Sequence, residues 1–331
     1  MSSAPTLPRS TEHGDRPAGG RRPRPTWERR ILWANLVAQI AIVLTGGAVR
    51  LTGSGLGCST WPQCEPGQFT PALQDATSWH PYIEFGNRTL TGVLALVALA
   101  TAWAVWTRRD RSRSFRLLGL VPLVGVALQA LVGGMTVLFE LHPGLVAGHF
   151  LISMTLVAAS TALLIRHGET DGDPTAVVGP LARRLTAALV PLAVVVLVLG
   201  VVTTGSGPHS GDADVGYRFA LDPALVARVH AGSVWLYVAG VVALVVAVHR
   251  GAASTAARNA ALLLLAVTAL QGLIGYVQYF AGLPELLVAA HMLGASLLVV
   301  AQVNQVLSTR ERSQPPEPGL KAFDLFPPST H

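Results

Sequence analysis

The chain has 331 residues, of which 51% are hydrophobic and only 13% charged, and its formal net charge is +6. A single water-soluble core cannot bury that much apolar surface, so the composition excludes an ordinary soluble globular protein. The positive charge does not indicate a nucleic-acid partner, because no recognisable nucleic-acid-binding motif accompanies it. We therefore expect an integral membrane protein.

Eight stretches are long and apolar enough to cross a bilayer as α-helices, which takes about 20 residues each. In chain order they are roughly 31–50, 84–106, 116–138, 144–166, 184–204, 225–248, 258–280 and 286–307. An arginine-rich leader precedes the first stretch and no small-residue cleavage site follows it, so we expect a retained helix rather than a signal peptide. The sequence predicts an all-α membrane protein with eight spans.

The basic residues predict how the chain is oriented. If the spans alternate in direction, twenty of the 24 Lys and Arg residues fall on one side. Basic loops resist translocation, so we expect a multi-pass protein of the cell membrane with both termini in the cytoplasm. The predicted segments are a disordered tail at 1–30, a first half at 31–166, a cytoplasmic linker at 167–183, a second half at 184–307 and a disordered tail at 308–331.

The chain also contains an internal repeat. At a constant offset of 142 residues, Leu128–Leu151 and Leu270–Leu293 are identical at ten of twenty-four positions, including His149 and His291. Shared apolar composition would not give so many matches. The repeat predicts two pseudo-symmetric four-helix bundles.

Three histidines lie inside apolar spans, namely His149, His230 and His291. A lone buried histidine is more often a hydrogen-bonded core residue, but an imidazole in hydrocarbon is costly without a partner or a metal. His230 comes seven residues after Pro223 and His291 six after Glu285, so both lie about 10 Å below the outer surface. Facing each other across one half, they suit the two axial positions of an iron porphyrin.

The first half carries a different set of residues. His149 faces a position equivalent to that of His230, and this position is occupied by Asn87, whose amide is a poor ligand for haem iron. A site with two histidines suits electron transfer, whereas a site with one leaves a position open for chemistry. Glu84 lies one helical turn before Asn87. It is a candidate base or cation stabiliser, or simply a partner of Arg88 at i+4.

Two cysteines, Cys58 and Cys64, lie in the first external loop, where disulfides form and persist. One interpretation is a structural staple. The other is a redox-active pair, because a short and exposed disulfide is readily reduced. The sequence leaves both open.

Several short motifs together resemble the haem A synthase family. They are Thr52–Gly55, which Thr204–Gly207 repeats, the Cys58/Cys64 loop, Ile83–Arg88, Gly148–Phe150, Arg228–Gly232 and Ala290–Met292. Each motif is weak alone, but the resemblance runs over about residues 30–307. It implies an oxidoreductase that converts the C8 methyl group of haem O to a formyl group, giving haem A for a terminal cytochrome oxidase.

The resemblance also implies roles for individual residues. These are His230 and His291 as axial ligands of a haem B cofactor, His149, Asn87 and Arg88 around the substrate haem O with His149 on its iron, and Glu84 as the catalytic carboxylate. Members of the family usually carry a histidine where Asn87 stands. The resemblance leaves three partners open: a haem O synthase, an electron acceptor of unknown identity and a second copy of the chain.

External arginines have two interpretations. Arg50, Arg88, Arg218 and Arg228 are candidates for ion pairs with haem propionates, or for ordinary positions at the membrane interface.

Two other classes of protein stay open. A membrane cytochrome would use the same histidines to pass electrons, linked to a quinone, without converting haem. A transporter built from parallel four-helix repeats fits less well, because the polar residues gather near the outer face and the spans lack obviously broken helices.

Overall fold

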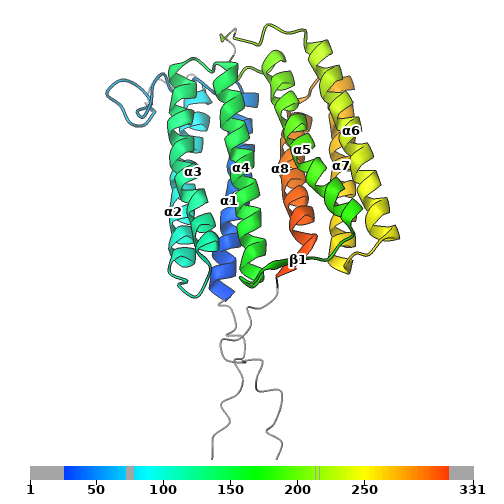
Figure 1. The fold of residues 1–331 in the computed structure, drawn as a ribbon. Helices are drawn as coiled ribbons and strands as arrows, with labels where there is room; N and C mark the ends of the chain where they lie inside the picture. The colour runs from blue at the N-terminus through cyan, green and yellow to red at the C-terminus, as the bar shows by residue number, and fades with distance from the viewer. Residues whose placement is uncertain (1–25, 72–77, 213, 216, 313–331) are drawn as a thin grey trace, which may run out of the picture.

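The structure is a computed structural model of the chain that describes residues 26–71, 78–212, 214–215 and 217–312. Eight long helices dominate it (Figure 1). They are α1 (Thr26–Leu51), α2 (His80–Trp106), α3 (Arg113–Leu138), α4 (Pro143–Gly168), α5 (Pro180–Ser206), α6 (Pro223–Arg250), α7 (Thr255–Phe280) and α8 (Glu285–Ser308). All eight are long and apolar enough to span a membrane, which confirms the predicted eight-span, all-α membrane protein.

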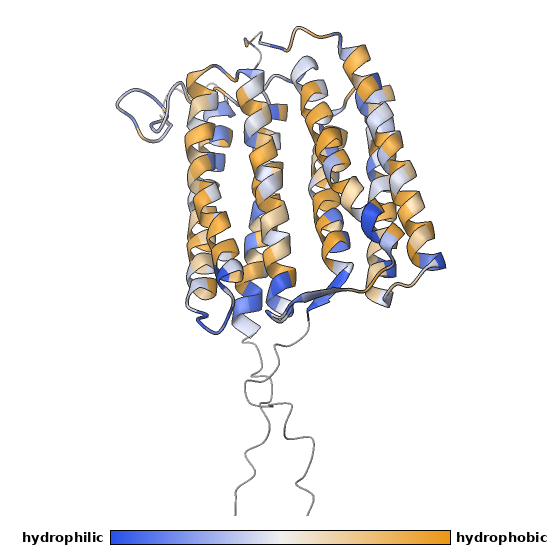
Figure 2. Ribbon diagram, in the orientation of Figure 1, coloured by the Kyte–Doolittle hydropathy of each residue, from blue (hydrophilic) through white to orange (hydrophobic). Residues whose placement is uncertain are grey.

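The outer surface of the helices is suited to lipid. Apolar residues run along the helices and hydrophilic residues gather toward their ends (Figure 2). Large side chains such as Leu96, Trp103 and Leu273 are at least 60% exposed. A water-soluble protein would bury these groups, whereas a bilayer is a favourable solvent for them.

Most helices begin or end a few residues beyond the predicted spans. The apolar pattern marks only the part that lies in hydrocarbon, while capping groups decide where the helix itself begins. The side chain of Ser112 accepts a hydrogen bond from the Phe115 N–H at the start of α3, and that of Ser254 does the same at the start of α7.

The helices pack as two sets of four. Within the first set, α1 contacts α2, α2 contacts α3, α3 contacts α4, and α4 closes against α1; α5 to α8 are joined in the same way. The two sets stand side by side (Figure 1), in contact where α8 packs on α1 and α4, and where α4 packs on α5. This arrangement is compatible with two four-helix bundles, whose pseudo-symmetry stays a prediction.

The internal repeat is visible in local backbone structure. Leu141 and Leu283, which are 142 residues apart, both adopt a left-handed conformation, with φ of 57° and 61°. Each N–H donates to the carbonyl five residues earlier, at 2.7 Å and 2.8 Å. The turns between α3 and α4 and between α7 and α8 therefore close in the same unusual way.

Both ends of the described chain lie at one end of the bundle, which we call the terminal face; the opposite end, which carries Cys58 and Cys64, is the disulfide face (Figure 1). At the terminal face, the structure differs from two predictions. Residues 26–30, expected in a disordered tail, form the first turn of α1. Strands β1 (Pro174–Ala176) and β2 (Arg310–Arg312), expected as linker and tail, pair antiparallel. The predicted disorder of 1–25 and 313–331 lies outside the described residues.

A buried carboxylate explains why α1 starts early. Glu28 is only 5% exposed and receives hydrogen bonds from Arg108 Nη1 at 2.8 Å and 2.7 Å. The His167 ring lies 3.1 Å from the same carboxylate. Arg108 also binds the exposed Asp110, and its hydrogen bonds to Asp110 and Glu28 together raise the pKa of the guanidinium above its ordinary value. One carboxylate thus ties α1 to α4 and to the loop before α3.

A second ion pair holds the linker after α4. Arg111 Nε donates to Asp171 Oδ2 at 2.6 Å, and the Ser112 N–H donates to the same oxygen at 2.9 Å. Burial alone would raise the pKa of Asp171, but the hydrogen bonds from Arg111 and Ser112 outweigh it and lower that pKa below its usual value.

We predict that Glu28→Ala destabilises the protein by about 2–4 kcal/mol, because it leaves Arg108 without its buried partner. Asp110→Ala removes a carboxylate from the same arginine, but this one is 61% exposed, so the loss should stay below about 1 kcal/mol. Thermal unfolding of both variants in detergent checks the difference. Equal losses would contradict the assignment of Glu28 as the central group.

Candidate functional site

The three span histidines occupy similar surroundings. Each ring packs against a glycine of the preceding helix, where a Cβ atom would come within 3.1–3.3 Å of the ring Cε1. The pairs are Gly133 with His149, Gly200 with His230, and Gly275 with His291. The missing side chain gives each imidazole its room between two closely packed helices.

Two glutamines hold the α4 and α8 histidines in equivalent ways. Gln129 Nε2 donates to the His149 carbonyl at 2.9 Å, and Gln271 Nε2 donates to the His291 carbonyl at 2.8 Å. The glutamines are themselves 142 residues apart. Their identity was visible in the repeat, but their contact with the histidine backbone was not predicted.

The ring nitrogens are unusual for groups inside membrane spans. Nδ1 of His149, His230 and His291 is buried and has no hydrogen-bond partner among the described residues, although each ring as a whole is only partly buried. His230 and His291 are near enough to interact electrostatically. Nε2 is not among the buried atoms that lack a partner, so Nε2, rather than Nδ1, is the ring nitrogen through which a metal would be bound.

Space is available beside His149. A Cβ on Gly148, which directly precedes His149, would meet no other atom within 4 Å. In the part of the chain that the structure describes, no three His, Cys, Asp or Glu side chains come together as a metal site. Axial ligation of an iron porphyrin asks only for one or two imidazoles and room for a flat ring. The residues present fit such a group.

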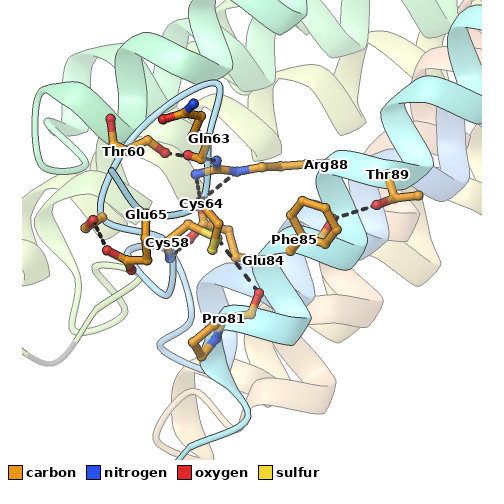
Figure 3. The surroundings of a disulfide bond; sticks show 11 residues. Cys58, Thr60, Gln63, Cys64, Glu65, Pro81, Glu84, Phe85, Arg88 and Thr89 are labelled. Carbon is orange, nitrogen blue, oxygen red and sulfur yellow. Dashed lines mark hydrogen bonds and ion pairs between the residues drawn. A yellow bond between two sulfur atoms is a disulfide. The ribbon is translucent and has the colours of Figure 1, made fainter. Parts of the chain in front are cut away.

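Glu84 lies at the top of α2, directly beneath the disulfide loop (Figure 3). Its side chain is 7% exposed. Oε2 accepts the Cys58 backbone N–H at 2.6 Å, and Oε1 accepts Arg88 Nε at 3.1 Å and a second, shorter hydrogen bond from the same guanidinium. The i+4 pairing with Arg88 is therefore present, and both oxygens have partners on the disulfide face.

Arg88 connects this carboxylate to the loop. Its Nη1 donates to the Thr60 carbonyl at 2.9 Å and to the Gln63 carbonyl at 3.1 Å (Figure 3). Cys58 and Cys64 are joined by a disulfide, as expected, and both are fully buried. Burial favours the structural interpretation, because a redox-active pair would have to be uncovered before a thiol could reach it.

The other arginines predicted to be external mostly bind backbone carbonyl groups. Arg50, on α1, donates from Nε to the His209 carbonyl at 2.7 Å and from Nη2 to the Thr204 carbonyl at 3.0 Å, so it joins the first half to the second. Arg218 binds carbonyl groups of its own loop. The exposed Arg228 donates to the Ala224 carbonyl of its own helix. The structure brings none of these three to a carboxylate of the described chain.

These features define a class of protein: an eight-span membrane protein with two imidazoles in one half, and with one imidazole, an amide and a clamped carboxylate in the other. The family model described as "Cytochrome oxidase assembly protein" matches residues 29–209, which is more than half of the chain. The chain belongs to the cytochrome oxidase assembly protein family.

Curated relatives carry a more specific name. The chain is similar to the "Heme A synthase" of Bacillus pumilus, with 36% identity over 143 residues, or 42% of this chain and 45% of the relative. It is 33% identical over 144 residues to that of Lysinibacillus sphaericus, covering 42% and 44% of the two chains. For Bacillus licheniformis the identity is 32% over 136 residues, or 41% and 43%. The matches span less than half the length of each relative.

We predict that Arg88→Leu makes the disulfide easier to reduce, since the loop loses its tether to Thr60 and Gln63. The rate of thiol alkylation after addition of a reductant to the folded protein should rise about tenfold, corresponding to one or two lost charge-assisted hydrogen bonds. Arg228→Leu is the matched control, because this arginine is exposed and binds only its own helix. Equal reduction rates in both variants would mean that Arg88 does not hold the loop.

Proposed function

We propose that the protein is a haem A synthase, an enzyme that oxidises the C8 methyl group of haem O to a formyl group. The observation that carries the proposal is the set of three imidazoles on α4, α6 and α8, each beside a glycine of the preceding helix, in a member of this family. The names of the curated relatives support the same reaction. Successive hydroxylations and loss of water from a gem-diol would give haem A for a terminal oxidase.

The second half supplies the cofactor site in this proposal. His230 and His291 lie on α6 and α8 and would hold haem B through their imidazoles. When bound, haem B supplies one-electron transfer. The protein's part is to fix both imidazoles, through the glycine gaps on α5 and α7 and through the Gln271 hydrogen bond.

The first half supplies the substrate site. His149 would bind the iron of haem O, with Asn87 and Arg88 around it and Glu84 as the catalytic carboxylate. The Glu84 carboxylate already accepts hydrogen bonds from Arg88 and the Cys58 N–H, which hold it in place. It is therefore preorganised to stabilise developing positive charge or to accept a proton. To act as a base, Glu84 would have to lose one of these hydrogen bonds.

The basic residues support a cytoplasmic terminal face and an external disulfide face. In that orientation both haem sites lie in the outer half of the membrane. A haem O synthase as donor, an electron acceptor and self-association are further partners in the proposal.

Haem analysis tests the reaction directly. Cells that make the protein together with a haem O synthase should contain haem A or hydroxylated haem O, measured by chromatography and mass spectrometry of extracted haems. Cells with the Glu84→Gln variant should retain haem B on the purified protein and lose at least about 90% of the haem A, since a missing catalytic group costs about a hundredfold or more. Haem on the wild-type protein without haem A would favour a membrane cytochrome instead.

Histidine variants test the assignment of the two sites. His230→Ala or His291→Ala should remove the low-spin haem spectrum of the purified protein, because one axial ligand is lost. His149→Ala should leave that spectrum and reduce haem A. His249→Ala is the control, since this exposed histidine lies at the terminal face and contacts the Val245 carbonyl. A retained low-spin spectrum in both His230→Ala and His291→Ala would refute the axial assignment.

A further inference from the structure

The two halves differ at the position opposite the shared histidine. In the second half, His230 on α6 accompanies His291 on α8. In the first half, His149 is the counterpart of His291, but the counterpart of His230 on α2 is Asn87. The duplication thus retains one imidazole in each half and replaces the other by an amide.

The orientation of that amide is fixed by a neighbouring helix. Thr45 Oγ1 on α1 donates to Asn87 Oδ1 at 2.8 Å. With its oxygen engaged, the side chain presents its Nδ2 hydrogens, for which the described residues provide no acceptor. An amide oxygen is a weak ligand for haem iron, and this one is already bound to a hydroxyl. Asn87 is therefore placed as a hydrogen-bond donor rather than as a metal ligand.

Thr45 has no polar counterpart in the second half. Seven residues before the repeated Thr-Gly-Ser-Gly motif, the first half has Thr45 and the second half has Leu197. The hydroxyl and the amide thus occur together, in the half that lacks a second imidazole. Such a pairing indicates a joint role.

We propose that the first half binds haem iron through His149 alone, and that Asn87, oriented by Thr45, donates a hydrogen bond to a small ligand at the opposite position of the iron. The ligand class is a small molecule that binds iron through a lone pair and accepts a hydrogen bond, such as a diatomic gas. The inference rests on the proposed function, because it assumes that this half receives a haem. The second half, with two imidazoles, is closed to such a ligand.

Carbon monoxide is the probe, and the sample is the purified full-length protein loaded to two haems per chain. After reduction, the wild type should bind one carbon monoxide per chain, at the site with an open position. Asn87→His supplies a second imidazole, so it should lower carbon monoxide binding by about tenfold or more. In the oxidised protein it should also replace a high-spin electron paramagnetic resonance signal by a second low-spin signal.

Two further variants test the hydrogen bond itself. Asn87→Leu and Thr45→Val should keep the carbon monoxide stoichiometry but move the C–O stretching frequency to a higher value, as in an apolar pocket. Carbon monoxide should also dissociate roughly fivefold faster, the factor that corresponds to one ordinary hydrogen bond. Thr89→Val is the matched control, because the exposed Thr89 hydroxyl binds the Phe85 carbonyl of its own helix.

Three results would overturn the inference: a wild-type protein that binds no carbon monoxide, a chain that takes up only one haem in a haem titration, or an unchanged C–O stretch in both Asn87→Leu and Thr45→Val. Haem A formation is scored separately in the same cells. Haem A made by a protein inert to carbon monoxide would retain the proposed function and remove the inference. Carbon monoxide binding without haem A would do the reverse.

Discussion

Hydrocarbon offers no hydrogen-bond partner, and this constraint decides how the polar residues of the eight spans are used. Some pair across helices: Asn35 donates to Ser160 at 2.8 Å, and Tyr237 donates to Gln302 at 2.6 Å. Others bond within their own helix, as the Thr161 hydroxyl does with the Val157 carbonyl. Nδ1 of each span histidine is buried without a hydrogen-bond partner among the described residues. Gln305 on α8 also lacks partners in the described structure, but a single bridging water would satisfy an amide. Three imidazoles beside glycine gaps instead fit the proposed haem sites.

The same constraint explains the disulfide loop. Glu84 lies near the end of a span, where an unpaired carboxylate would be costly, and the loop supplies the Cys58 N–H that binds it. Arg88 completes the arrangement by holding both the carboxylate and two loop carbonyl groups. The loop and the candidate catalytic residue therefore form one unit, because the disulfide closes the loop whose Cys58 N–H binds the carboxylate. This structural role explains why the disulfide is buried, although the proposed orientation places it on the side of an oxidising compartment.

The sequence predicted what depends on local pattern. Apolar runs identified all eight spans, and the repeat with its histidines identified the candidate sites, because these features are written in neighbouring residues. Contacts between distant residues were not predictable. Glu28 looked like part of a charged tail, since its partners Arg108 and His167 lie far along the chain. Nothing in the sequence of α1 indicates that Arg50 binds carbonyl groups of the second half. Strands of three residues give no pattern of their own.

The two halves share the features that position one histidine and differ at the residue opposite that histidine. The glycine gap, the glutamine on the histidine carbonyl and the left-handed leucine recur at the same offset, and they involve backbone or ring edges. Such contacts hold one imidazole in place whatever stands opposite it. The opposite position was therefore free to diverge, to His230 in one half and to Asn87 in the other. Glu84 also has an apolar counterpart, Ala227, so both Asn87 and Glu84, which are proposed to lie around the substrate, differ from their counterparts. Under the proposed function, one half would thus be saturated with ligands for electron transfer and the other half would be left open for chemistry.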